Sequence, residues 1–197
     1  MRIGLYGGTF DPIHNGHLRV IVELISRKVV DKIILIPAGD PQLRKESPNA
    51  DGVTRAEMCR LAISDLPSGI KELTSVDEIE IKRPGPSFAI DTVEALIASN
   101  SHKGDEYFWI IGSDAYEKID QWHRASQLKE LVSFIVIDRP DGDSESNSVT
   151  SSVTNSEGLD IGALDISATK IRSDKSVSGV SPSVRKYIMD RKLYASK

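Results

Sequence analysis

Short, uninterrupted apolar runs, separated by amphipathic helical stretches, limit most strongly how this chain can fold. Each run is followed at once by a break, and the runs cover residues 3–6, 33–36, 108–111 and 134–137. Uninterrupted apolar runs of this length are typical of strands buried on both faces of a parallel sheet. The sequence therefore predicts repeated strand-helix units and a parallel α/β sheet.

Helical periodicity fills the connections between these runs. Apolar residues recur at helical spacing from Leu18 to Val29 and again from Ile90 to Ile97. Ser181 followed by Pro182 is typical of a helix start, and the apolar residues after it predict a closing helix.

Two further stretches differ from this pattern. Residues 76–81 alternate, with isoleucines on one side and glutamates on the other, which predicts a strand near the edge of the sheet. Residues 141–158 contain too little apolar surface to offset the entropy of ordering them and predict a mobile surface loop.

We expect a single domain over residues 1–197, because a chain of this length can bury one sizeable core.

Charge and cysteine content exclude several classes of protein. The net charge of −4 provides no global basic field for nucleic acid or for an anionic membrane, so bound phosphates would need a local site. Cys59 is the only cysteine, which rules out an internal disulfide and a cysteine-based zinc cluster. The chain has no signal-peptide pattern and no apolar run of membrane-spanning length, and we expect it in the cytoplasm.

The loop after the first apolar run is the main candidate for chemistry, because open parallel sheets bind ligands beyond the carboxyl ends of their strands. It runs from Gly7 to His17 and reads Gly-Gly-Thr-Phe-Asp-Pro-Ile-His-Asn-Gly-His. Gly7 and Gly8 allow backbone to approach a ligand, and the helix start directs N–H groups at an anion. His14 and His17 are three residues apart and can face one phosphate.

Two other interpretations of this loop stay open. The glycines could form only a tight strand-to-helix turn, with the histidines as a cap and a surface residue. The histidines could also bind a metal, but His102 and His123 are isolated in sequence and no cysteine is near.

The loop resembles the His-x-Gly-His signature of the nucleotidyltransferase superfamily, and residues 166–172, Ile-Ser-Ala-Thr-Lys-Ile-Arg, resemble its second motif. Residues 83–92, residues 112–114 with Trp122 downstream, and residues 138–140 are similar to segments of bacterial nicotinate-nucleotide adenylyltransferases. These motifs follow the family's order along nearly the whole chain. The resemblance implies a Rossmann-like, doubly wound parallel sheet with a small helical cap over about residues 167–197.

The resemblance also implies a role for each matching residue. The ATP phosphates would be bound by Thr9, His14, His17 and Arg172, the last from the N-terminal turn of a later helix. The other implied nucleotide-binding residues are Gly7, Gly8, Phe10, Gly112, Asp114, Ser167, Thr169 and Ile171. The acceptor would be held by Lys45, Ser87, Phe88, Ala89 and Trp122, with the Trp122 ring stacked on the pyridine ring.

Some of these positions have structural alternatives or depart from the family. Trp122 could be a core aromatic, Asp114 a helix cap and Arg172 a surface charge. The family commonly has Tyr-Thr where this chain has Phe88-Ala89, and Ser where it has Ala168. Backbone N–H groups at residues 88 and 89 could still hold a carboxylate.

By the same resemblance, the activity is transfer of AMP from ATP to nicotinate mononucleotide, which gives deamido-NAD and pyrophosphate. The implied partners are ATP, accompanied by Mg²⁺, and nicotinate mononucleotide, with no nucleic acid and no membrane; self-association is left open. Alternatives are another acceptor, such as nicotinamide mononucleotide or phosphopantetheine, a CTP-using relative, a non-catalytic nucleotide-binding module, and a metal-dependent hydrolase.

Overall fold

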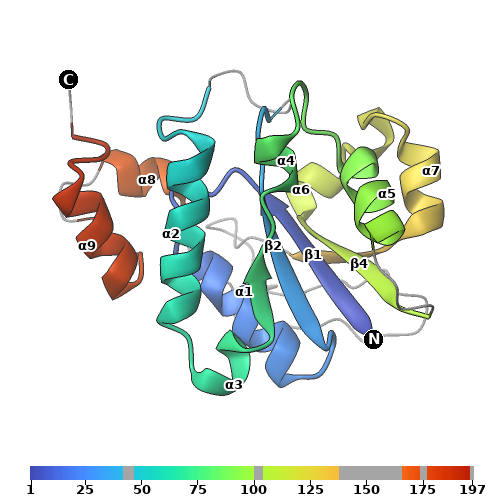
Figure 1. Cartoon of the computed structure of the whole chain (residues 1–197), viewed down its shortest axis with the longest axis horizontal. Coiled ribbons are helices and arrows are strands. Elements are labelled where there is room, and N and C mark those ends of the chain that lie inside the picture. Colours follow the sequence, from blue (N-terminus) through green and yellow to red (C-terminus); the bar gives the residue numbers. More distant parts are fainter. Residues whose placement is uncertain (42–46, 100–103, 138–165, 174–176, 196–197) are drawn as a thin grey trace.

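A five-stranded parallel sheet forms the centre of the molecule (Figure 1). The computed structural model describes residues 1–41, 47–99, 104–137, 166–173 and 177–195. The strands are β1 (Arg2–Gly8), β2 (Lys32–Pro37), β3 (Thr74–Val76), β4 (Glu106–Gly112) and β5 (Ser133–Ile137). The four strands predicted from the apolar runs are confirmed, and the α/β fold class with them.

The strand order β3-β2-β1-β4-β5 places a change of direction in the middle of the sheet. The chain builds outward from β1 through β2 to β3 and then crosses back to add β4 and β5 on the other side. Doubly wound sheets bind ligands beyond the carboxyl ends of the strands that flank such a change of direction, which are β1 and β4 here.

Helices cover both faces of the sheet (Figure 1). One apolar cluster joins the sheet to α1 (Asn15–Ser26), α2 (Gly52–Ser64), α8 (Ala168–Ser173) and α9 (Pro182–Asp190). A second joins the opposite face to α5 (Ala89–Ser99) and α7 (Ala125–Leu131). The short helices are α3 (Ser68–Lys71), α4 (Ile79–Lys82), α6 (Ser113–Tyr116) and the 3-10 turn η1 (Ile119–Gln121).

Neighbouring residues of one strand explain the uninterrupted apolar runs. In β4, Ile110 belongs to the cluster under α1 and α2, whereas Trp109 and Ile111 belong to the cluster under α5 and α7. Each face of the sheet is thus covered by the apolar sides of helices, and the strand needs apolar side chains on both of its own sides. No helix within the described residues is both long and apolar enough to cross a membrane.

The predicted closing helix is confirmed as α9, with Ser181 at its N-cap and Pro182 as its first residue. Figure 1 shows α8 and α9 side by side on the outer side of α2, at the end of the molecule away from α5 and α7. This is the small C-terminal helical cap. The predicted loop at residues 141–158 lies outside the described residues.

The prediction of a strand over residues 76–81 was wrong beyond its first residue. β3 ends at Val76, and residues 79–82 form the single turn α4. The Asp77 carboxylate accepts a hydrogen bond from the Ile79 N–H at 2.9 Å, which turns the chain out of the sheet. The Glu80 side chain is only 5% exposed and accepts a hydrogen bond from the Thr92 hydroxyl at 2.8 Å.

The N-cap of α2 supports a first prediction. The Asp51 carboxylate accepts a hydrogen bond from the Thr54 N–H at 2.7 Å, and this bond lowers the pKa of Asp51. We expect Asp51→Ala to lower the free energy of unfolding at pH 7 by about 0.5–2 kcal/mol. Because the folded-state pKa is depressed, the charge-dependent part is complete above an unfolded-state pKa of about 3.9 and is lost as the pH falls through the folded value.

Urea unfolding of the Asp51 variants between pH 3 and pH 7 measures this effect. Asp51→Asn keeps an acceptor at the cap without a titrating group, so its cost at pH 7 should be smaller than that of Asp51→Ala and should shrink as the pH falls and Asp51 of the unchanged chain becomes protonated. Equal stability of Asp51→Ala and the unchanged chain at pH 7 would contradict the assignment of the cap.

Candidate active site

The two signature histidines lie together at the start of α1. His14 is the N-cap of the helix, and the His14 backbone N–H donates to Nδ1 of His17 at 3.1 Å. The two imidazole rings stack with their centroids 3.7 Å apart and their planes inclined by 27°. The expected juxtaposition of the histidines at a helix N-terminus is therefore present, with His14 in the cap position.

The ring of His17 is held on several sides. The Phe10 ring meets it nearly edge-on at a centroid distance of 5.0 Å, and the Tyr6 ring does so at 5.9 Å. Because Nδ1 accepts a hydrogen bond, the neutral imidazole carries its proton on Nε2, which is then a fixed donor. A preorganised donor beside a helix N-terminus suits a phosphate oxygen.

The glycines at the end of β1 have a packing reason in addition to any ligand. A Cβ at Gly7 would lie 2.5 Å from the Trp109 ring, and one at Gly8 would lie 2.9 Å from the Phe10 ring. Phe10 itself adopts φ 48, in the left-handed region, and is 3% exposed. Two buried aromatic rings therefore pack directly against the glycine backbone at the start of this loop, where a side chain would not fit.

Arg172 reaches this loop from α8. Its guanidinium donates through one NH group to the Asp11 carbonyl at 2.7 Å and through the other to the Thr169 hydroxyl at 3.2 Å. Arg172 lies in the last turn of α8 rather than in the N-terminal turn expected from the motif. Ser167 caps that helix by accepting from the Lys170 N–H at 3.2 Å, and the Ile171 side chain is buried in the core.

Two buried charged residues that the motif analysis did not single out hold the loop. The Asp11 carboxylate, 1% exposed, accepts from the backbone N–H groups of Asn49 at 2.8 Å and Ala50 at 3.2 Å. The Arg55 guanidinium, also 1% exposed, donates to the carbonyls of Thr9 at 2.6 Å, Ala38 at 2.6 Å and Ala50 at 3.1 Å. Burial lowers the pKa of Arg55, and the nearby Asp11 charge opposes this effect.

The second nucleotide-binding segment follows β4. Gly112 is the N-cap of α6, and Asp114 lies exposed in its first turn. Since β1 and β4 are parallel neighbours in the sheet, Gly112 and the Gly7–His17 loop follow their carboxyl ends at the same edge. The tertiary structure thus brings together two predicted segments that are about 100 residues apart.

The expected acceptor-binding residues gather around the start of α5. The Ser87 hydroxyl accepts from the N–H groups of Gly39 at 2.9 Å and Asp40 at 3.1 Å and so ties this loop to the end of β2. The Phe88 ring stacks on His123 at 4.3 Å, and Ala89 is the first residue of α5. The backbone at residues 88 and 89 therefore lies at a helix N-terminus, where a carboxylate is favoured.

Trp122 lies in the same apolar cluster as Phe88. Its ring meets Trp109 edge-on, with centroids 6.4 Å apart, and its Nε1 is buried without a hydrogen-bond partner among the described residues. The ring is partly buried, so the packing role is present, and stacking on a substrate ring stays a prediction. Lys45, the remaining predicted acceptor residue, lies outside the described residues.

The buried carboxyl group of Glu80 is hydrogen-bonded to residues of the predicted acceptor loop and of α5. The Glu80 carboxylate accepts from the Thr92 hydroxyl at 2.8 Å, and Arg83 donates to that hydroxyl at 3.0 Å. Burial raises the pKa of Glu80, opposed by hydrogen bonds from Thr92 and Ser87. A Cβ at Gly39 would lie 2.2 Å from the Glu80 carbonyl oxygen, so the end of β2 and α4 are in close contact.

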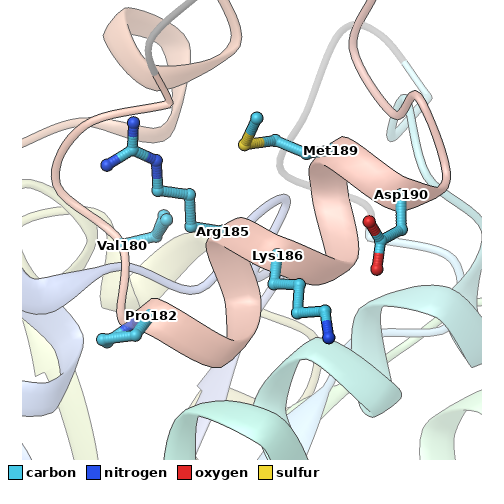
Figure 2. Close-up of a pocket in the computed structure, with 6 residues that line it drawn as sticks. All are labelled: Val180, Pro182, Arg185, Lys186, Met189 and Asp190. Carbon is cyan, nitrogen blue, oxygen red and sulfur yellow. The ribbon is translucent and has the colours of Figure 1, made fainter.

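A surface hollow of about 390 Å³ lies elsewhere, along α9 (Figure 2). Its lining residues belong to α9 and the segment just before it, and Figure 2 shows Arg185 and Lys186 pointing in opposite directions. None of the lining residues is a predicted site residue. Among the described residues no group of three or more His, Cys, Asp or Glu could hold a metal ion.

The cytidylyltransferase-like family model matches residues 5–176. A probable nicotinate-nucleotide adenylyltransferase of Bacillus pumilus is 38% identical over 201 residues, with 99% of each chain covered. A probable nicotinate-nucleotide adenylyltransferase of Synechococcus is 33% identical, with 98% of this chain and 94% of the relative covered. Plasmodium falciparum nicotinic acid mononucleotide adenylyltransferase complexed with NaAD superposes with a TM-score of 0.77 at 19% identity, covering 98% and 97% of the two chains.

The fold, the paired histidines at the start of α1 and the family match define the class of protein: the chain belongs to the cytidylyltransferase-like family of nucleotidyltransferases. At this identity and coverage, its curated relatives place it within the nicotinate-nucleotide adenylyltransferases. The solved Plasmodium structure supports the fold independently of sequence.

Proposed function

We infer that the chain transfers AMP from ATP to nicotinate mononucleotide, giving deamido-NAD and pyrophosphate. The observation that carries this conclusion is the His14–His17 pair at the N-terminus of α1, directly after the loop that follows β1. The acceptor is assigned from the names of the curated relatives. The start of α5 provides a helix N-terminus suited to the acid group of that acceptor.

The reaction is a direct in-line attack of an acceptor phosphate oxygen on the α-phosphorus of ATP. The bond from that phosphorus to the bridging oxygen breaks, and pyrophosphate leaves. His14, His17 and Arg172 act as donors to the oxygens on which charge accumulates, and the helix N–H groups add to their effect. Mg²⁺ enters bound to the triphosphate and shields its charge.

The remaining roles complete this assignment. We assign the ATP side of the site to Thr9, Gly112 and Asp114. We assign the acceptor side to Ser87, Phe88, Ala89 and Trp122. We place the reaction in the cytoplasm and treat residues 1–197 as one catalytic domain.

Pyrophosphate release with ATP and Mg²⁺ tests the function when nicotinate mononucleotide and nicotinamide mononucleotide are compared under identical conditions. We expect a large preference for the acid, because a helix N-terminus stabilises a carboxylate more than a neutral amide. Equal rates would show a dual-specificity enzyme. No release with either substrate would favour another acceptor or a non-catalytic module.

A further inference from the structure

The C-terminal end of the described chain reaches into the phosphate-binding loop. The Tyr194 hydroxyl donates to Oδ1 of Asp11 at 2.7 Å, across a sequence separation of 183 residues. Asp11 lies three residues before His14, and its carboxylate is almost completely buried. One end of the molecule is therefore hydrogen-bonded to the residue that links the β1 end to the catalytic histidines.

The geometry of the tail indicates that this contact is specific. Lys192 and Tyr194 adopt φ 51 and φ 60, which are left-handed conformations that non-glycine residues rarely adopt. Such residues persist where surrounding contacts hold them. Here the Leu193 N–H donates to the Ile188 carbonyl at 3.0 Å, and the Leu193 and Tyr194 side chains pack on the core.

Asp11 connects Tyr194 to the groups that face ATP. The Asp11 carbonyl accepts from Arg172 at 2.7 Å, and the Arg172 guanidinium lies 4.0 Å from the Asp11 carboxylate. The same carboxylate accepts hydrogen bonds from the backbone N–H groups of Asn49 and Ala50. A hydroxyl that fixes this carboxylate also fixes the loop before His14 and the position of Arg172.

We propose that Tyr194 is a positioning residue for ATP: its hydroxyl holds Asp11, and through Asp11 it sets the phosphate-binding loop and Arg172. This proposal rests on the proposed adenylyl transfer. Tyr194 touches neither substrate and transfers no proton. Its hydrogen bond does not reach Ser87, Phe88 or Trp122, so its effect should concern the triphosphate and not the acceptor.

Steady-state kinetics of Tyr194→Phe in the full chain test the proposal, with each substrate varied separately. We expect kcat/KM for ATP to fall about 10- to 100-fold, the range for loss of a hydrogen bond to a charged group. Much of that fall should appear in KM for ATP, while KM for nicotinate mononucleotide stays within about twofold. The control is Tyr187→Phe, which removes a tyrosine hydroxyl from α9. The Tyr187 ring packs against the Arg191 guanidinium, and this variant should change neither KM value.

The separate KM values distinguish positioning from loss of folded protein. Partial unfolding would lower the apparent kcat while both KM values stayed unchanged, and a thermal unfolding midpoint for each variant sets an assay temperature well below the transition. An unchanged KM and kcat for ATP in Tyr194→Phe would overturn the proposal, as would equal rises in both KM values. If the unchanged chain itself released no pyrophosphate, the proposed function would fail instead.

Discussion

Replacing His17 with asparagine should lower turnover about 100- to 1000-fold while the protein stays folded. Nδ1 of His17 accepts the His14 N–H, and an asparagine oxygen can take that acceptor position at the start of α1. The donor at Nε2 is lost, because asparagine ends before it. A donor that is preorganised toward the developing charge acts most strongly in the transition state, so kcat should fall more than KM rises.

His17→Gln is the matched variant, because its amide nitrogen can extend to about the position of Nε2. It should keep more turnover than His17→Asn, and the two should have similar thermal unfolding midpoints. Pyrophosphate release at saturating ATP and nicotinate mononucleotide measures both variants. Turnover of His17→Asn within about fivefold of the unchanged chain would rule out His17 as a hydrogen-bond donor to the ATP phosphates.

Replacing Arg55 with methionine should lower the free energy of unfolding by about 3–5 kcal/mol. The buried guanidinium is the common donor to the carbonyls of Thr9, Ala38 and Ala50. Its removal leaves these carbonyls without that donor and removes a positive charge close to the Asp11 carboxylate. Methionine reaches about as far as the Nε atom of arginine, so the apolar stem is kept and the cost arises where the guanidinium and its polar contacts are lost.

Arg60→Met is the control on the same helix. Arg60 forms partly exposed ion pairs with Glu57 and Glu78, and such pairs contribute about 0–1 kcal/mol. Urea unfolding monitored by circular dichroism compares the two variants. A cost for Arg55→Met no larger than that for Arg60→Met would show that the buried network contributes little to stability.

Several parts of the fold could be predicted because they depend on local sequence. The apolar runs predicted β1, β2, β4 and β5, since strands covered on both faces need apolar residues throughout. The pair Ser181-Pro182 predicted the start of α9. The spacing of His14 and His17 predicted two neighbouring imidazoles at a helix start, because residues three apart lie on the same side of a helix, and the structure adds that the two rings stack.

Other parts depend on contacts between distant segments. The alternation in residues 76–81 predicted a strand near the edge of the sheet, but these residues leave the sheet after Val76, and Thr92 from α5 donates a buried hydrogen bond to the Glu80 carboxylate. Arg55 resembles any charged residue on a helix, and only the fold surrounds it with three carbonyls. The bond from Tyr194 to Asp11 joins positions at opposite ends of the chain and has no local sequence signal.

Periodicity and short motifs encode local geometry, so the parallel α/β class, the position of the Gly7–His17 loop and the two histidines within it could be predicted from the sequence. How that loop is held depends on contacts between segments that only folding brings together. Buried polar groups must find partners wherever the chain places them, so the partners of Asp11 and Arg55 include Ala38 just after β2, Asn49 and Ala50 just before α2, and Tyr194 after α9.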